Sequence, residues 1–171
     1  MEQRLASAAT SINIVPAVFK SKAFLQSGTD RNLDIGGGRF DTATQWLLDQ
    51  YGIHNFIYDP FNRDDDHNAA VLEAFQHHPA PTVTVSNVLN VIAEEDVRHS
   101  VIAMAYGCLL PGGSAFFTIY EGDGFGVGKA TPKGWQCHRR WRSFLPEISA
   151  VFPLVKIMER IVIAIRPPPA A

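Results

Sequence analysis

The chain has 171 residues, of which 46% are hydrophobic and 19% are charged, and its formal net charge is -2. This length and balance are typical of a soluble globule with a hydrophobic core, so we predict one domain over residues 1–171. A net charge close to zero provides no general attraction to nucleic acid or membrane, which leaves local patches to select a partner.

Apolar periodicity and turn residues predict helices that alternate with strands. In chain order we expect a helix over 5–26 that is broken near Pro16, a strand over 32–35, a helix over 41–52, a strand over 54–59, a helix over 62–78, a strand over 82–87, a helix over 93–110, a strand over 114–120, a helix over 136–152 that Pro146 breaks or kinks, and one or two strands over 154–166. This order predicts an α/β fold with a doubly wound, mostly parallel sheet flanked by helices.

Three segments are expected to lie outside this alternating core. Residues 1–30 form an N-terminal helical segment, residues 122–146 form a glycine-rich and basic substrate loop and helix, and residues 167–171 form a disordered tail. We expect the glycine-rich part of the second segment to be mobile, since it has little apolar content.

Polar residues and glycines cluster just past the predicted strand ends. The glycines of the stretch NLDIGGGRFD follow the first strand, and Asp59, Asn87 and Glu121 follow or end later ones. In a doubly wound sheet the ligand binds at the carboxyl ends of the strands. We therefore expect these residues to share one rim.

The three consecutive glycines after Asp34 allow several interpretations. A phosphate-binding loop would need a lysine that the sequence lacks there, and a GxGxxG dinucleotide loop fails because Asp41 occupies the last glycine position. A glycine turn that binds nothing stays open as an alternative. An acid ahead of the glycines suits an ammonium group better than a phosphate, since a carboxylate repels a phosphate.

The ordered set of motifs resembles the class I S-adenosylmethionine-dependent methyltransferases over about residues 30–121. The set comprises D-x-G-x-G from Asp34, an acid at the end of the second strand, and LLPGG before a buried strand. The resemblance implies a Rossmann-like fold that binds S-adenosyl-L-methionine. It implies that Asp34 helps to hold the methionine end, that the backbone of Gly36, Gly37 and Gly38 approaches the cofactor closely, and that Asp59 takes both ribose hydroxyls.

The resemblance also implies contacts for residues farther along the rim, and it shows departures from the family. Further cofactor contacts are assigned to Pro60, Phe61, Asn87 and Val88, with Phe61 either stacking on adenine or packing in the core. Phe40 occupies the family's third glycine position. The segment between the second and third predicted strands has room for one helix only, so the family's third strand, an edge strand, and its adenine-binding acid are expected to be absent.

Methyl transfer from a sulfonium is an in-line displacement, in which the protein mainly aligns the nucleophile and takes up its proton. Asn87, Tyr120 and Glu121 are the candidates for catalytic contacts, and a helix cap is the alternative role for Asn87. The acidic run DDDHN is interpreted as a helix start rather than a metal site, because consecutive residues point in different directions. We expect no metal.

A basic and aromatic stretch, KATPKGWQCHRRWR, follows the glycine-rich loop and contains no acid. Substrate-binding residues are predicted to be Lys129, Lys133, Trp135 and Arg139. Such a stretch suits a phosphate backbone with stacked bases, and it suits a small anionic molecule equally well. The alternative is a helix with tryptophans in the core and arginines in water.

The leading hypothesis is therefore an S-adenosylmethionine-dependent methyltransferase whose acceptor is nucleic acid or a small anionic molecule. Two alternatives are a non-catalytic S-adenosylmethionine-binding regulatory protein and, disfavoured by its glycine spacing, an NAD-dependent oxidoreductase. Cys108 and Cys137 lack CxxC spacing and are interpreted as reduced thiols. No apolar run approaches the roughly 20 residues of a membrane span, and we expect no secretory signal, no membrane partner and a cytoplasmic location.

Overall fold

The computed structural model describes residues 14–131 and 134–169. In chain order the elements are η1 (Ala17–Lys20), α2 (Lys22–Leu25), β1 (Arg31–Ile35), α3 (Thr42–Tyr51), β2 (His54–Tyr58), α4 (Asp65–His77), β3 (Ala80–Ser86), η2 (Leu89–Val91), α5 (Glu95–Gly107), β4 (Leu109–Thr118), β5 (Phe125–Thr131), β6 (Gly134–Arg139), η3 (Trp141–Phe144), α6 (Leu145–Ser149), β7 (Leu154–Met158) and β8 (Ile161–Ile165).

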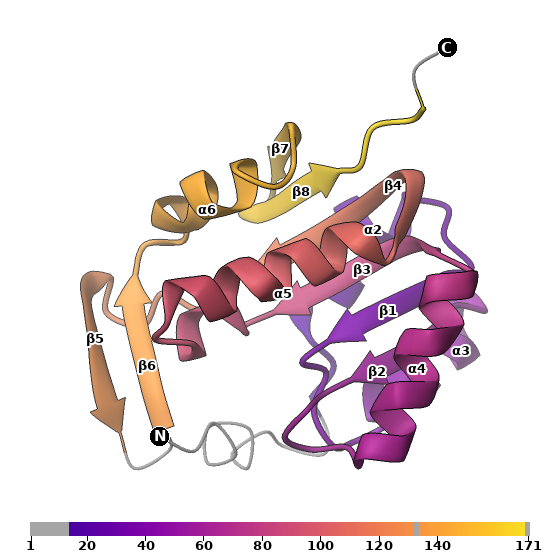
Figure 1. Ribbon diagram of the computed structural model, residues 1–171, viewed down its shortest axis with the longest axis horizontal. Coiled ribbons are helices and arrows are strands. Elements are labelled where there is room, and N and C mark those ends of the chain that lie inside the picture. Colours follow the sequence, from indigo (N-terminus) through magenta and orange to yellow (C-terminus); the bar gives the residue numbers. More distant parts are fainter. Residues whose placement is uncertain (1–13, 132–133, 170–171) are drawn as a thin grey trace.

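One sheet of six strands organises the molecule, in the order β2-β1-β3-β4-β8-β7 (Figure 1). Strands β2, β1, β3 and β4 are parallel, whereas β8 is antiparallel to β4 and β7 is antiparallel to β8. The predicted doubly wound, mostly parallel α/β sheet is therefore confirmed. In the register of the central strands, Asp34 lies opposite Ile57 and Thr84, so the ends of β1, β2 and β3 meet at one edge.

Two hydrophobic clusters cover the two faces of the sheet. One contains Val71 and Phe75 of α4, Ile102 of α5 and Ile148 of α6. The other contains residues of η1, α2 and α3, with Leu47 among them. Figure 1 shows α4 and α5 in front of the sheet and α3 behind it. Burial on both faces explains the apolar run Ala115–Phe117 of β4.

The segment between β2 and β3 contains α4 and no strand over residues 59–79, all of which the structure describes. Strand β2 is consequently an edge of the sheet. This agrees with the expected loss of one edge strand.

The N-terminal helix is shorter than predicted. Of the predicted span 5–26, the described part forms the 3-10 turn η1 and the single helical turn of α2, and residues 5–13 lie outside the described residues. Pro16 precedes η1, and Ser21 between the two turns has the extended backbone angles φ -77° and ψ 148°. An extended residue interrupts the helical hydrogen bonding, so one continuous helix cannot form.

The glycine-rich and basic region differs most from the prediction. A loop followed by a helix from residue 136 was expected, but Phe125–Thr131 and Gly134–Arg139 form the antiparallel strand pair β5–β6, called the hairpin below, and helical structure begins only at Trp141. Glycines with positive φ at 122, 124, 126 and 134 allow the turns. The Thr131 hydroxyl donates to the Gly134 carbonyl oxygen over 2.6 Å and closes the hairpin. Figure 1 shows the hairpin beyond the edge to which β1, β3 and β4 point.

The last two strands form a tight hairpin, which settles the expectation of one or two strands over 154–166. Glu159 and Arg160 connect β7 to β8 with φ values of 52° and 66°. Two successive residues with positive φ are typical of the turns that join two-residue hairpins. Within residues 14–131 and 134–169, no helix has the length and apolar character needed to cross a bilayer.

Candidate functional site

The glycine loop after β1 comes close to two neighbouring segments. Gly36 has φ +76° and donates its N–H to the Tyr58 carbonyl oxygen over 2.7 Å. A Cβ at Gly36 would lie 2.4 Å from Cγ2 of Val88, so no larger residue fits. Gly38 has φ +80° and donates its N–H to Oδ2 of Asp59 over 2.9 Å. The loop is thereby hydrogen-bonded to the end of β2 and packed against Val88, which follows β3.

Asp34 lies directly beneath this loop and is 2% exposed. Its Oδ1 accepts a hydrogen bond from the Thr84 hydroxyl over 2.7 Å. Its Oδ2 faces Gly37, where a Cβ would lie only 2.4 Å away, and accepts no hydrogen bond from the described residues. Burial raises the pKa of Asp34 to about 7, against the lowering effect of the Thr84 hydrogen bond and with a further raising effect from the charge of Asp59.

A chain of buried side chains supports Asp34 from the sheet. Asn32, on β1, donates from Nδ2 to Oδ1 of Asn55 over 2.7 Å and to the Thr84 hydroxyl oxygen over 2.9 Å. Asn55 in turn donates to the hydroxyl of Thr44 over 3.0 Å. Because the Thr84 oxygen accepts from Asn32, its single proton is directed to Asp34. The sequence signal was present but unused: polar residues alternate with apolar ones in both β1 and β3.

Asp59, 4% exposed, organises the segment after β2. Besides the bond from Gly38, its Oδ1 accepts from the backbone N–H groups of Phe61 and Asn62 over 3.0 and 3.1 Å and from Nδ2 of Asn62 over 3.0 Å. Asn68 holds the backbone of Asp59 from α4, through bonds of 2.9 and 3.0 Å to its N–H and carbonyl. Oδ2 therefore has the remaining acceptor capacity, since each carboxylate oxygen has about two lone-pair sites.

Two charged side chains near the loop pair with each other. Asp41 precedes α3 and makes no capping bond to that helix. It pairs instead with Nη2 of Arg63 over 2.7 Å, and Nε of Arg63 donates to the Gly38 carbonyl oxygen over 3.0 Å. Arg63, which the sequence did not single out, thus fixes the outer side of the glycine loop. Asp64 caps α4 by accepting from the N–H of His67 over 2.8 Å, as the helix-start interpretation of the acidic run requires.

The remaining predicted cofactor contacts lie along the same edge. Pro60 is exposed and Phe61 is 45% exposed, so the Phe61 ring does not belong to the core. Asn87 is exposed, has φ 58°, and donates its N–H to the Thr118 carbonyl oxygen over 2.8 Å. A left-handed conformation is uncommon for a residue other than glycine, and such residues concentrate at functional sites. Among the described residues, no group of three or more His, Cys, Asp or Glu side chains could hold a metal ion.

The candidates after β4 lie farther along the edge. Tyr120 is 56% exposed and packs its ring edge-on against His138, with ring centroids 5.7 Å apart. Glu121 accepts from the Trp141 N–H through Oε1 over 2.9 Å and binds Arg160 through Oε2. Both oxygens of Glu121 therefore already have partners, which makes this side chain a link between β4, η3 and the β7–β8 turn. Its predicted catalytic contact stays a prediction.

The predicted substrate-binding residues that the structure describes lie on the two strands of the β5–β6 hairpin and have different surroundings. Lys129 is exposed on β5, and Trp135 on β6 is half-buried with its ring against Gly128, where a Cβ would lie 2.0 Å from it. Lys133 lies outside the described residues. Arg139 is ion-paired with Glu147, and its guanidinium lies 3.8 Å from the centre of the Phe144 ring.

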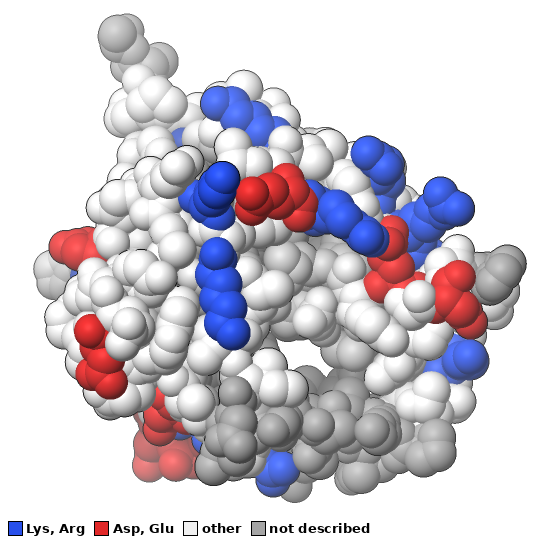
Figure 2. All heavy atoms as spheres, turned by 180° about the vertical axis from the view of Figure 1, so that it is seen from behind, with Lys and Arg blue, Asp and Glu red and all other residues white. Residues whose placement is uncertain are grey.

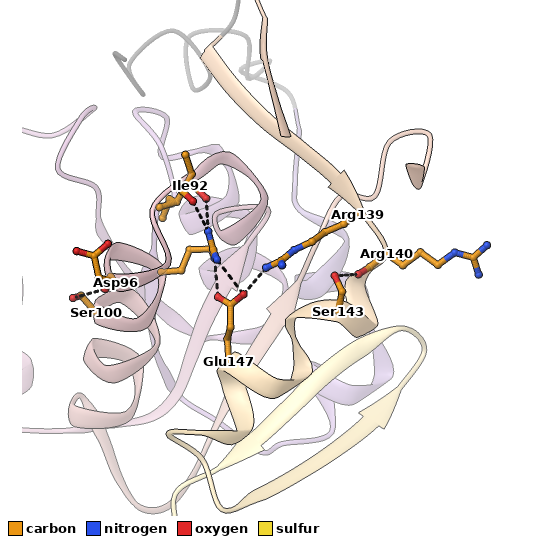
Figure 3. Close-up of polar contacts among 9 residues, drawn as sticks. Ile92, Asp96, Ser100, Arg139, Arg140, Ser143 and Glu147 are labelled. Atoms are coloured by element: carbon orange, nitrogen blue, oxygen red, sulfur yellow. Dashed lines mark hydrogen bonds and ion pairs between the residues drawn. The ribbon is translucent and has the colours of Figure 1, made fainter. Parts of the chain in front are cut away.

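A buried ionic cluster joins this hairpin to the helices (Figure 3). Glu147 of α6 accepts from Nε and Nη2 of Arg98 over 2.7 and 3.1 Å and also pairs with Arg139. Nη1 of Arg98 donates to the carbonyl oxygens of Ile92 and Ala93 over 3.0 and 2.8 Å. Burial alone would raise the pKa of Glu147, but the hydrogen bonds and charges of the two arginines lower it. Arg98 was not singled out from the sequence, because it lies in the polar first half of α5 beside Asp96, His99 and Ser100 and there resembles an exposed charge.

The face turned toward the reader in Figure 2 carries basic and acidic side chains in alternation along its upper right, the side on which the hairpin lies. A cleft of about 510 Å³ is lined by Glu121, Asp123, Arg140, Trp141, Arg142 and Arg160 together with two glycines. The cleft brings together the residues after β4, the start of η3 and the β7–β8 turn, which are far apart in the sequence.

The fold is that of the class I S-adenosylmethionine-dependent methyltransferases, as comparison with solved structures shows. An O-methyltransferase family protein from Burkholderia thailandensis matches with a TM-score of 0.57 and 18% identity, over 90% of this chain and 55% of that one. An amino pentose methyltransferase from Micromonospora echinaspora, solved with S-adenosylmethionine bound, matches with a TM-score of 0.56 and 13% identity, over 94% of this chain and 93% of that one. Human N-acetylserotonin methyltransferase in complex with S-adenosylmethionine matches with a TM-score of 0.54 and 15% identity, over 98% and 52%.

This chain spans about half the length of several of the proteins that it matches. No protein-family model and no curated protein sequence matches it. At these identities the likeness establishes the fold, and the activity has to be argued from the site.

Proposed function

We propose that the chain binds S-adenosylmethionine at the carboxyl edge of β1 and β2 and transfers its methyl group to a small acceptor molecule. The observation that carries the proposal is the arrangement of Asp34, the glycine loop and Asp59. Two buried carboxylates lie on either side of a loop of three glycines, and the N–H of Gly38 donates a hydrogen bond to Asp59. A dinucleotide site would instead place a pyrophosphate beside Asp34, where the carboxylate would repel it.

The residues present suit the chemical groups of this cofactor. Oδ2 of Asp34 has no donor among the described residues and is suited to the ammonium group of the methionine part. Oδ2 of Asp59 accepts the N–H of Gly38 and has capacity for a second donor, which suits a ribose hydroxyl. Oδ1 accepts a single side-chain bond, from Asn62, and a ligand hydroxyl can take the place of that donor. The exposed ring of Phe61 offers a surface for the adenine. When bound, the cofactor supplies an already activated methyl group.

The chain's own contribution would then be orientation of the acceptor and removal of its proton. Asn87 and Tyr120 reach the edge with exposed side chains and are the groups that we assign to acceptor contact. Three structural neighbours support a small acceptor: an amino pentose methyltransferase, N-acetylserotonin methyltransferase and a glycopeptide N-methyltransferase.

Calorimetric titration tests the cofactor site. We expect S-adenosylmethionine and its demethylated product to bind and NAD to fail. Asp34→Asn and Asp59→Ala should each weaken binding roughly tenfold or more, the usual loss for a hydrogen bond to a charged group. Asp30→Asn is the matched control, because Asp30 is an exposed acid at the opposite end of β1. Unchanged affinity in both site variants would contradict the assignment.

Transfer of a labelled methyl group tests the activity separately. The protein is incubated with labelled S-adenosylmethionine and fractionated pools of metabolites, DNA, RNA and protein, and we expect label in the metabolite fraction. Tight cofactor binding without label in any pool would instead favour the non-catalytic regulatory protein. Label in DNA or RNA alone would contradict the small-molecule acceptor.

A further inference from the structure

We propose that the cleft between the end of β4 and the start of η3 binds the anionic group, phosphate or carboxylate, of the acceptor. This inference rests on the proposed function, which it extends by naming the acceptor's chemical class. The cleft's volume of about 510 Å³ lies within the range of small-ligand pockets, roughly 300–1,000 Å³.

The cleft lies on the same edge of the sheet as the glycine loop. Glu121 follows β4, and Arg160 lies in the turn before β8, whose Val162 pairs with Phe117 near the end of β4. Only β3 separates β4 from β1. Neighbouring strands are about 4.8 Å apart, so β4 lies roughly 10 Å from β1, a distance that one small molecule can span.

Glu121, an acid of the cleft, is already paired. It binds Arg160 and the backbone N–H of Trp141. Oδ1 of the second acid, Asp123, lies 3.4 Å from Nδ1 of His138, which forms an ion pair with it when the imidazole is protonated. The contacts of Glu121 fix the wall of the cleft and reduce the negative charge that opposes an incoming anion.

Two arginines of the cleft lining differ from Arg160, which is paired with Glu121. Arg140 and Arg142 are exposed, and neither forms an ion pair with an acid of the described residues. Figure 3 shows the Arg140 side chain directed away from Glu147, in contrast to its neighbour Arg139, which points toward that acid. The chain therefore places adjacent arginines in two different roles.

Trp141 supports the guanidinium of Arg142. It is 5% exposed, and the guanidinium of Arg142 lies 4.6 Å from the centre of its ring. Stacking on a buried aromatic ring restricts the orientation of a guanidinium group, which lowers the entropy lost on binding. Two guanidinium groups on one wall favour phosphate or carboxylate, since both anions accept paired hydrogen bonds from arginine.

Phenyl phosphate and benzoate test the inference, because they share one ring and differ in their anionic group. Each is titrated into the full chain at constant ionic strength. We expect at least one to bind, and Arg140→Gln and Arg142→Gln each to weaken it roughly tenfold. Lys156→Gln removes an exposed positive charge from β7 and should leave the affinity unchanged. Circular dichroism checks that the variants fold, as substitutions of exposed side chains should allow.

Binding of only one probe supports the inference and identifies phosphate or carboxylate as the recognised group. The inference is overturned if neither probe binds to a wild-type protein that binds S-adenosylmethionine, or if both arginine variants retain full affinity. Failure of S-adenosylmethionine to bind while a probe still binds would overturn the proposed function instead. An oligonucleotide whose binding depends on Lys129 and not on Arg140 would also contradict the inference, in favour of nucleic acid.

Discussion

Asp34 is buried and is also the residue to which we assign the ammonium group of the cofactor. A carboxylate enclosed by protein is costly to ionise, and Asp34 accepts one hydrogen bond from Thr84 while its other oxygen faces the glycine loop. The sequence predicted Asp34 from its place before the glycines. It did not predict that Thr84, fifty residues later, would determine its ionisation, because that contact depends on the pairing of β1 with β3.

Cofactor binding should therefore depend on pH through Asp34. The pKa of Asp34 is about 7, and the ionised form is the one that attracts an ammonium group, so affinity should rise as the pH increases through that value. Thr84→Val removes a donor that lowers this pKa. We expect the rise in affinity to move to higher pH and the affinity at pH 7 to fall roughly three- to tenfold.

Calorimetry of the wild type, Thr84→Val and Thr84→Ser between pH 6 and pH 8.5 measures this effect. Thr84→Ser keeps the hydroxyl and should restore the wild-type pH profile. A Thr84→Val profile with its midpoint at the wild-type pH would show that the hydroxyl does not control the ionisation of Asp34.

At the scale of elements, the parallel strands were predictable and the β5–β6 hairpin was not. Buried strands carry β-branched and apolar runs that local pattern detects. The hairpin has glycines in both strands and ends in a basic run that begins at Arg139, a composition that resembles a loop followed by a polar helix. What holds it in place is tertiary: β6 packs against η2, and Arg139 reaches Glu147 on α6.

The ionic cluster around Glu147 should make a measurable contribution to stability. Glu147→Gln leaves Arg98 and Arg139 without their counter-charge in a largely buried site, and we expect a loss of about 2 kcal/mol in the free energy of unfolding. Because the pKa of Glu147 lies below its usual 4.5, the carboxylate stabilises the fold at neutral pH, and this contribution is lost as the pH falls through the folded-state pKa. The difference between wild type and variant should shrink accordingly in acid.

Urea unfolding at pH 7 and at decreasing pH provides the measurement. Glu73→Gln, an exposed position on α4, is the control and should change the stability little. An equal stability of Glu147→Gln and wild type at pH 7 would contradict a structural role for the cluster.

For the whole molecule, the sequence predicted the architecture better than it predicted the acceptor side. The carboxyl edge joins strand ends in an order that topology rules anticipate, so the glycine loop, Asp59, Asn87 and Glu121 were expected on one rim and follow the strands that end there. The anion cleft could not be anticipated in this way. It depends on how the hairpin, η3 and the β7–β8 turn fold back onto the end of β4, and no local motif encodes that arrangement.

The place of β2 at the edge of the sheet has a consequence for the choice of methyl donor. A nucleobase stacked on Phe61 would have no further strand of the described residues beyond its exocyclic amine. Donor analogues that carry a bulky alkyl group on that amine should therefore bind within about threefold of the natural compound, as competition titration would measure. The wild-type protein would then accept chemically tagged donors without any mutation. Rejection of these analogues would show that residues other than β2 and its neighbours enclose the amine.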